Sequence, residues 1–346
     1  MSRSTNNPWL AKFAVFTAFA TLCLIGVGGV VTSKGVGMSV PDWPNTYGYN
    51  MFLFPVSKWV GGIFYEHSHR LVASWVGMLT TALAVWIWLK EERAWLRKLA
   101  VVAFFAVVFQ GVLGGLRVVK MKDEIGIFHA VLAQGFLCLM MAIAVFLSRW
   151  WQRLSSENSS ISDAARMKRF FLVTTLLVFV QLALGATMRH QHAGLAVPDF
   201  PLAYNSIWPA TDAASIERYN QLRIDDHQYN AITAGQIHLH MAHRLMAFVV
   251  LAHVVICWAK ARGGKAGPAL GRLTSVWLGL ILLQAGLGVV TVLKNKPADI
   301  ATAHVVVGAA SLALGTLISM ILFRLAGQRA PEVAPALKPA LAGSRG

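Results

Sequence analysis

Residues 66–89 read EHSHRLVASWVGMLTTALAVWIWL, and residues 240–259 read HMAHRLMAFVVLAHVVICWA. In each stretch a His-Arg pair, which starts at His69 and at His243, begins an apolar run. Both runs are long enough to cross a bilayer, which takes about 20 residues. The two pairs are 174 residues apart. The same polar motif at the start of two such runs indicates an internal repeat.

Further motifs recur in the same order along the chain. A glutamine with a Leu-Gly pair returns after 174 residues, a second histidine after 175, and a Pro-Asp-aromatic-Pro turn after 157. The second half therefore carries 17 extra residues between this turn and its His-Arg pair. The repeated residues are Gln110 and Gln284, Leu113-Gly114 and Leu287-Gly288, His129 and His304, and Pro41-Asp42-Trp43-Pro44 and Pro198-Asp199-Phe200-Pro201.

The composition is typical of a membrane protein. Of the 346 residues, 56% are hydrophobic and only 13% are charged, about half the charged fraction of a soluble domain. We therefore predict an all-α integral membrane protein with eight transmembrane helices. The predicted spans are 13–32, 69–89, 99–117, 127–147, 170–188, 240–259, 273–293 and 302–323.

The spans divide into two groups of four. We predict an N-terminal half at 13–147 and a C-terminal half at 170–323, joined by a cytoplasmic linker at 148–169. Residues 324–346 are predicted to be a disordered cytoplasmic tail. Because four crossings is an even number, the halves have the same orientation. We expect two pseudo-symmetric four-helix bundles related as a parallel repeat.

The formal net charge of +16 reflects orientation in the membrane rather than a nucleic-acid partner. With a cytoplasmic N-terminus, 19 of the 31 lysines and arginines fall on the cytoplasmic side and 10 on the outer side. This excess is the positive-inside signal. We expect a multi-pass protein of the bacterial cytoplasmic membrane with both termini in the cytoplasm.

Each half carries two histidines on separate spans: His69 and His129, then His243 and His304. In the predicted topology all four lie within the first few residues of spans that run inwards from the outer side. If each pair faces the bundle interior, each half holds a six-coordinate haem iron near the outer face. The alternative is that each histidine is an interfacial or capping residue. Four histidines at duplicated positions favour the ligand interpretation.

The halves differ one turn before the His-Arg pair, where the first has Glu66 and the second has His240. The spacing i, i+3 puts each of these residues on the face of the ligand histidine. A carboxylate there suits chemistry on a substrate, because it can take a proton or stabilise developing positive charge. The alternative is a solvated glutamate paired with Arg70. The residues leave open whether His240 or His243 is the ligand, although the repeat register favours His243.

Arg70 and Arg244 directly follow the histidines. A guanidinium at the outer edge of a haem suits a propionate group, because it is permanently charged and can bind bidentately. The alternative for each arginine is snorkelling to the lipid headgroups.

The small residues of the spans are attributed to helix packing. Cys23, Cys138 and Cys257 lie in separate apolar spans without a CxxC pair, so we expect them to be packing residues. Small residues let membrane helices approach closely. The glycines interpreted in this way are Gly26, Gly28, Gly29, Gly111, Gly114, Gly115, Gly286 and Gly288.

Together these residues resemble the haem A synthase family. The similarity covers about 13–323, and it rests on Glu66-x-x-His69-Arg70, His129, His243-Arg244, His304 and the two Pro-Asp-aromatic-Pro loops. The resemblance implies an oxidoreductase that oxidises the C8 methyl of haem O to a formyl group by successive hydroxylations. Its product is haem A, which is used in cytochrome c oxidase assembly.

The resemblance also implies a role for each residue. Haem O synthase and an electron donor are the expected partners, while the source of oxygen, the donor and the oligomeric state stay open. Some family members carry two cysteines around the Pro-Asp-Trp turn, where this chain has Val40 and Thr46, so no thiol–disulfide step is expected. By resemblance, His69, His129 and Arg70 bind haem O, Glu66 is catalytic, and His243, His304 and Arg244 hold a resident haem b.

Two other functions compete with this one. A dihaem b-type electron-transfer protein would need one haem towards each face of the membrane, whereas all four histidines map to the outer side. A transporter built from repeats would need broken helices or midplane charges, and the span interiors carry almost no ionisable residue except His253.

Overall fold

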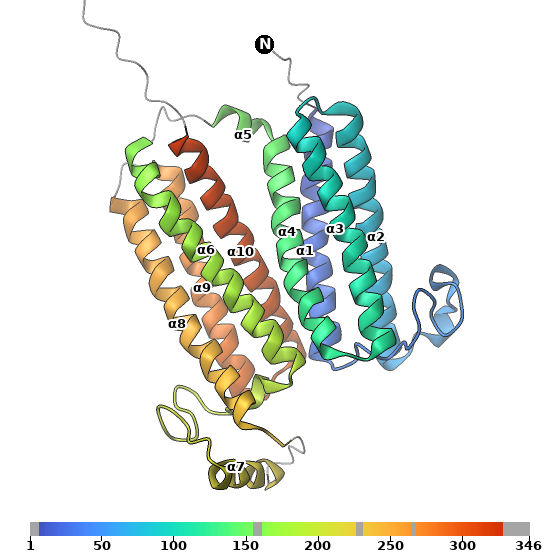
Figure 1. The fold of residues 1–346 in the computed structure, drawn as a ribbon, viewed down its shortest axis with the longest axis vertical. Coiled ribbons are helices and arrows are strands. Elements are labelled where there is room, and N and C mark those ends of the chain that lie inside the picture. The colour runs from blue at the N-terminus through green and yellow to red at the C-terminus, as the bar shows by residue number, and fades with distance from the viewer. Residues whose placement is uncertain (1–6, 155–160, 226–230, 264–266, 328–346) are drawn as a thin grey trace, which may run out of the picture.

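The computed structural model describes residues 7–154, 161–225, 231–263 and 267–327. Within these ranges there is no strand, only two isolated bridges in loops. Eight of the helices described are long and apolar enough to cross a membrane, which confirms the predicted all-α, multi-pass membrane fold (Figure 1). They are α1 (Pro8–Ser33), α2 (Gly61–Lys90), α3 (Ala94–Lys120), α4 (Asp123–Leu147), α6 (Ile161–His190), α8 (Ala234–Gly263), α9 (Pro268–Leu293) and α10 (Ala298–Ala326).

Local sequence signals explain where several helices begin and end. α1 starts with a proline at its first turn, and the side chain of Asn7 accepts hydrogen bonds from the amides of Trp9 and Leu10. α3 ends at Met121, which takes the left-handed conformation. α4 follows at once, with Asp123 and Glu124 in its positively polarised first turn. So short a connection makes α3 and α4 antiparallel neighbours.

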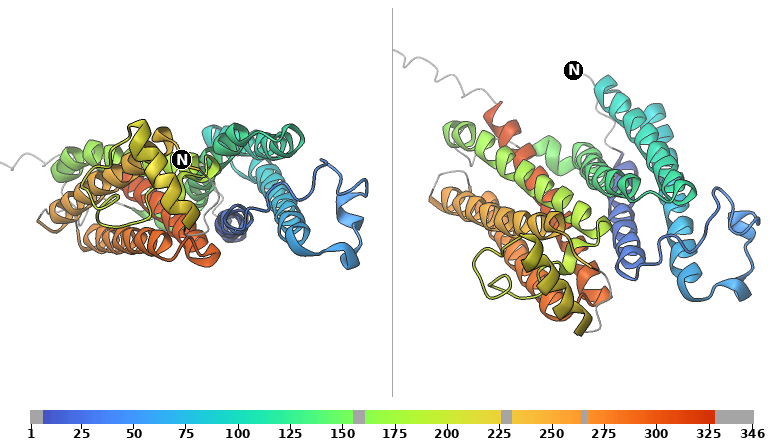
Figure 2. Two further views of the ribbon diagram at one scale, coloured as in Figure 1. Left: turned by 90° about the horizontal axis from the view of Figure 1, so that it is seen from below. Right: turned by 60° about the horizontal axis from the view of Figure 1, so that its bottom comes forward.

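The long helices form two groups. In the first, α2 and α4 each pack against α1 and α3; in the second, α8 and α10 each pack against α6 and α9. α2 and α4 are therefore diagonal partners, as are α8 and α10. The groups meet where α1 and α4 contact α10 and where α4 contacts α6, and both views in Figure 2 show them side by side. This arrangement is compatible with the expected repeat.

The apolar core of each group lies away from the long loops. In the first group it includes Ala14 of α1, Leu83 of α2 and Met140 of α4. All three lie towards the end where α1 begins and where α2 and α4 finish. In the second it includes Phe171 of α6 and Trp277 of α9, again at that end. The end that adjoins the two long loops, here called the loop end, carries most of the candidate polar side chains, together with a smaller apolar cluster that includes Val197 and Ile237.

The helices extend beyond the predicted spans. α6 begins inside the predicted linker, which also contains a short helix α5 (Arg149–Arg153), and α10 continues to Ala326, inside the predicted tail. The rest of that tail, 328–346, lies outside the described residues. Each ligand-candidate histidine lies about two turns inside its helix rather than in the first few residues. An apolar run marks only the part of a helix that suits hydrocarbon, so it misses polar end turns.

A further helix, α7 (Ala213–Asp225), forms in the second long loop and was not predicted. Asp212 stabilises its start, because its carboxylate accepts hydrogen bonds from the Ser215 amide at 3.0 Å and the Ser215 hydroxyl at 2.7 Å. These bonds lower the pKa of Asp212. The helix lies in the part of the chain where the second half is longer than the first.

Candidate functional site

Four histidines meet in two pairs at the loop end. His69 of α2 and His129 of α4 interact electrostatically across the first group, and His243 of α8 and His304 of α10 do so across the second. Both pairs are borne by diagonal helices of a bundle, and each imidazole lies against a helix that packs between the two. The structure thus brings together the two pairs that the repeat predicted.

Each of these imidazoles rests against a glycine of the preceding long helix. A Cβ built on that glycine would lie 3.0–3.3 Å from Cε1 of the ring, closer than ordinary van der Waals contact. Only a residue without a side chain leaves the ring its place. The pairs are Gly28 with His69, Gly114 with His129, Gly185 with His243, and Gly288 with His304.

The ring nitrogens are under-used by the protein. In the described part of the chain, Nδ1 of His69, His129 and His243 is buried and has no hydrogen-bond partner, whereas Nδ1 of His304 lies 3.0 Å from the carbonyl of Gln284. His304 differs, because its Nε2 also lies 3.4 Å from Nε2 of Gln284. No group of three or more metal-ligating side chains was found among the described residues. Two imidazoles per bundle fit the axial ligands of a porphyrin iron, which needs only two protein ligands.

Glutamines support the histidine helices in both groups. Gln110 Nε2 donates to the carbonyl of His129 at 3.1 Å, and Gln181 Nε2 donates to the carbonyl of His243 at 3.1 Å. Gln181 Nε2 also lies 3.3 Å from Nε2 of His243. These bonds tie each histidine-bearing turn to the helix that carries its glycine, so they orient the imidazole.

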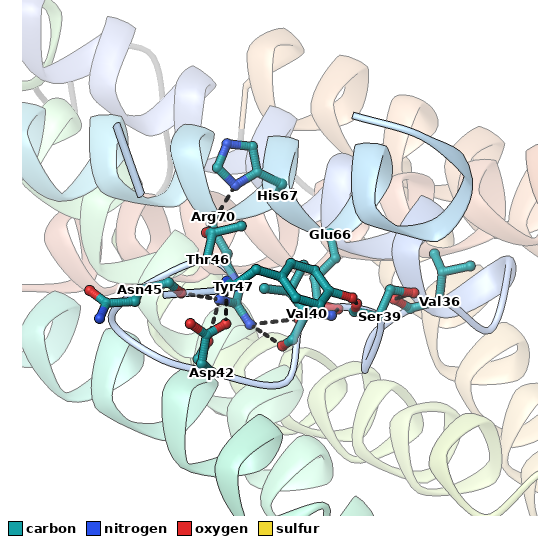
Figure 3. A network of polar contacts seen from close by, with 10 residues as sticks. All are labelled: Val36, Ser39, Val40, Asp42, Asn45, Thr46, Tyr47, Glu66, His67 and Arg70. Atoms are coloured by element: carbon teal, nitrogen blue, oxygen red, sulfur yellow. Dashed lines mark hydrogen bonds and ion pairs between the residues drawn. The ribbon is translucent and has the colours of Figure 1, made fainter. Parts of the chain in front are cut away.

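Glu66 is buried, with 3% of its surface exposed. One of its carboxylate oxygens is bonded to the loop that precedes its helix and the other to Arg70 (Figure 3). Oε2 of Glu66 accepts a hydrogen bond from the Val40 amide at 2.9 Å, and Oε1 accepts one from Arg70 Nη2 at 2.9 Å. The pairing with Arg70 considered above is present, but the carboxylate is not solvated. Each oxygen keeps one further lone pair for a substrate or a proton.

Arg70 clamps the first loop to α2. Its Nη1 donates to the carbonyls of Asp42 at 2.6 Å and Asn45 at 3.0 Å, and its Nη2 donates to the carbonyl of Val40 at 2.6 Å. The terminal nitrogens of this guanidinium are therefore committed to the backbone and to Glu66. Its predicted role towards a haem edge stays a prediction.

Arg244 repeats this clamp in the second half. Its terminal nitrogens donate to the carbonyls of Val197 at 3.1 Å, Asp199 at 2.6 Å and Leu202 at 3.0 Å. These are the acceptor positions of the first loop, each shifted by 157 residues. The two Pro-Asp-aromatic-Pro turns thus have the same anchor, although only the first anchor includes a carboxylate.

The aspartate of each turn holds the turn closed. Asp42 accepts hydrogen bonds from the amides of Tyr47 and Gly48, both at 2.8 Å, and Asp199 does the same for Tyr204 and Asn205. Burial acts to raise the pKa of Asp42, but the Gly48 and Tyr47 amides and the Arg70 charge outweigh it and lower that pKa. The turn is therefore built around an ionised carboxylate.

His240 and His243 take different places. His243 lies against Gly185 and interacts electrostatically with His304, as a member of an axial pair would. His240 has 2% of its surface exposed and occupies the position of Glu66 in the repeat. The geometry favours His243 as the ligand.

Two functional candidates, Arg117 of α3 and His190 of α6, were not found from the sequence. The sequence interpretation made Arg117 the last residue of the span 99–117 and put His190 in the second long loop. In the structure each lies near the end of a long helix, and His190 is 6% exposed. A signal for Arg117 existed, because it follows Gly114 by one helical turn. No such signal existed for His190.

The three cysteines lie apart within helices and are free. The two loop positions where cysteines were considered are occupied by buried residues that hold the loop to α2. Val40 donates its amide to Glu66, and the hydroxyl of Thr46 lies 3.2 Å from Nδ1 of His67. Hydrogen bonds therefore anchor this loop.

Comparison with known proteins places these features in a family context. Residues 11–316 match the family described as Cytochrome oxidase assembly protein. The chain is 33% identical over 210 residues to a haem A synthase of Shouchella clausii, which covers 58% of this chain and 65% of that protein. It is 23% identical over 334 residues to a haem A synthase of Shewanella oneidensis, covering 91% and 96% of the two chains. It is 26% identical over 332 residues to one of Geobacillus kaustophilus, covering 93% of each.

Proposed function

The chain belongs to the cytochrome oxidase assembly protein family, together with haem A synthases, and from this premise we propose that it oxidises haem O to haem A. It is an enzyme of haem A biosynthesis. In the proposed reaction, two successive hydroxylations of the C8 methyl group and loss of water leave a formyl group. The product serves the assembly of cytochrome c oxidase.

One observation carries the proposal. The two histidine pairs match in their helices and glycines, yet only the first has a carboxylate one turn from its histidine, at Glu66. A carrier of electrons has no use for such a group, whereas a site that does chemistry on a substrate carbon gains from a group that accepts a proton or stabilises developing charge. We therefore assign haem O to His69 and His129 as substrate.

The second pair, His243 and His304, would hold haem b as a resident cofactor, which supplies electron transfer when bound. The residues of this chain fit it, because both rings lie against glycines of helices that pack between α8 and α10. Gln181 Nε2 lies 3.3 Å from Nε2 of His243, and the backbone carbonyl of Gln284 lies 3.0 Å from Nδ1 of His304, so these residues orient the two rings. The second group has no carboxylate at the Glu66 position, which suits electron transfer without substrate chemistry.

Glu66 acts on the substrate in this proposal. Its carboxylate would stabilise the positive charge that develops at the methyl carbon as the oxidant withdraws electrons from it, and would accept the proton that the oxidation releases. The Val40 amide and Arg70 keep it in position, and its burial excludes water from it. Haem O synthase and an electron donor are the proposed partners.

We assign the loop end to the outer side of a bacterial cytoplasmic membrane, with both termini in the cytoplasm. The distribution of lysines and arginines supports this orientation. Both histidine pairs then lie near the outer face. A dihaem protein that moves electrons across the membrane would need pairs at opposite ends, and this argues against the alternative.

The test is Glu66→Gln in a strain whose own enzyme has been removed. We expect haem A in membrane extracts to fall about 100-fold or more and haem O to accumulate, while the purified variant keeps its haem b. Glu124→Gln is the matched control, because it changes an exposed carboxylate at the loop end of α4. It should leave haem A unchanged. Normal haem A in the Glu66 variant would remove this residue from the reaction.

A further inference from the structure

Arg117, near the loop end of α3, is a largely buried cation whose ion pairing among the described residues is loose: its Nη2 and Nδ1 of His190 both lie 3.9 Å from Oδ1 of Asp123. The side chain of Arg117 is 17% exposed, and that of Asp123 is 44% exposed. Nε of Arg117 is buried and has no hydrogen-bond partner among the described residues. The five N–H donors of this guanidinium are thus almost unused.

The other arginines at this end differ from Arg117. Arg70 and Arg244 donate to loop carbonyls. Arg189 donates to the carbonyl of Gly29 and the hydroxyl of Ser33, both at 3.0 Å. Because a buried charge is costly unless it is closely paired, the loose pairing of Arg117 with an exposed carboxylate leaves its guanidinium able to bind a second anion.

The surroundings of Arg117 show where that anion would lie. Arg117 Nε and His190 Nδ1 are both 2.8 Å from the point where a Cβ would stand on Gly126 of α4, so these two groups are neighbours. The charge of Arg117 also acts on His69, His129 and Glu66. The cation therefore adjoins the first histidine pair.

The feature is specific to the first half. The repeat places Thr291 at the position of Arg117, and the hydroxyl of Thr291 donates to the carbonyl of Leu287 in its own helix. His190 comes from α6, which belongs to the second group. A site at Arg117 is thus built on the substrate half and completed by a residue of the other half.

We propose that Arg117, together with His190, binds a carboxylate group of the porphyrin substrate. This inference rests on the proposed function, since haem O carries two propionate groups. The guanidinium binds a carboxylate through paired N–H donors, and His190 donates a third hydrogen bond. The contact fixes the rotation of the porphyrin between His69 and His129, and so decides which methyl group is presented to Glu66.

The test uses the full-length protein in detergent and two probes, haem O and its dimethyl ester, titrated by absorbance. We expect the wild type to bind the acid about tenfold or more tightly than the ester. In Arg117→Gln this ratio should fall to near one, and Arg117→Lys should keep part of it. Lys120→Gln, which changes an exposed cation one turn further along α3, is the matched control and should keep the wild-type ratio.

Haem b content reports whether a variant is folded, because that cofactor is assigned to the other half. His190→Gln is a second variant with an intact guanidinium, and its ratio should fall partway. A wild-type ratio in Arg117→Gln, or equal binding of acid and ester by the wild type, would overturn the inference and leave the proposed function standing. If the wild type binds neither probe, the proposed function falls and the inference with it.

Discussion

Arg70 and Arg244 occupy equivalent positions, but they are bonded differently. Both donate to three carbonyls of the preceding loop, and only Arg70 also neutralises a buried carboxylate. Removing one member of a buried ion pair leaves the other charge without compensation, which costs about 3–5 kcal/mol. Losing hydrogen bonds to neutral carbonyls costs less.

This difference gives a prediction for single residues. Arg70→Ala should lower the melting temperature of the purified protein clearly more than Arg244→Ala, because it strands Glu66 as well as releasing the loop. The measurement is thermal unfolding in detergent followed by tryptophan fluorescence. An equal decrease in the two variants would show that the Glu66–Arg70 pair adds no stability.

At the scale of the helix, glycines have two separate uses. Gly26 and Gly29 of α1 pack against Val306 and Thr302 of α10, whose side chains would each lie 3.2 Å from a Cβ at the glycine, as expected for glycines that let helices approach. Gly28, Gly114 and Gly288 also lie against a neighbouring helix, but there they leave space for imidazoles. For Gly111 and Gly286 the packing interpretation was wrong, because a Cβ there meets nothing within 4 Å among the described residues. Sequence spacing cannot separate these uses, because both place glycine on a buried helix face.

Gly286 and Gly288 of α9 provide a test of whether a glycine leaves space for an imidazole. Gly288→Ala should weaken haem b binding, because the new methyl group meets His304 at 3.1 Å and overpacking costs about 1–3 kcal/mol. Gly286→Ala, where a Cβ meets nothing within 4 Å, is the control. Both changes favour the helix by about 1 kcal/mol, so helix stability does not explain a difference between them.

The readout is haem b per mole of purified protein and its absorption spectrum. We expect Gly288→Ala to lose haem b or to shift its spectrum, while Gly286→Ala keeps both. Gly114→Ala should retain haem b, because its imidazole partner His129 belongs to the other pair. Equal haem b in Gly288→Ala and Gly286→Ala would contradict the inference that Gly288 leaves space for the His304 ring.

At the scale of the whole molecule, the two groups of helices are proposed to divide the work. His243→Ala and His304→Ala should each lower the haem b content of the purified protein. His69→Ala and His129→Ala should keep haem b and lose haem A formation. Pyridine haemochrome analysis of the four variants measures this, and loss of haem b from the first pair with retention in the second would reverse the assignment of the halves.

The two groups are joined by hydrogen bonds at the loop end. Arg189 of α6 reaches the last turn of α1, and the hydroxyl of Ser33 there lies 3.2 Å from that of Thr302 in α10. The same region brings His190 beside Arg117. The loop end is therefore where residues of the two halves are shared.

The sequence by itself determines the eight membrane helices, the two related series of motifs and the four histidines. Length of an apolar run and spacing between motifs are properties of the chain alone, so they are readable without coordinates. The matching clamps at Arg70 and Arg244 were partly readable, because the turns and the arginines recur, but their hydrogen bonds were not.

Only the tertiary structure decided which side chains meet. Arg117 and His190 are brought together over Gly126 by the packing of α3, α4 and α6, and Glu66 is tied to an amide 26 residues earlier. These contacts depend on how helices rotate and cross, which is set by the sum of many packing interactions. No local pattern in the chain encodes that sum.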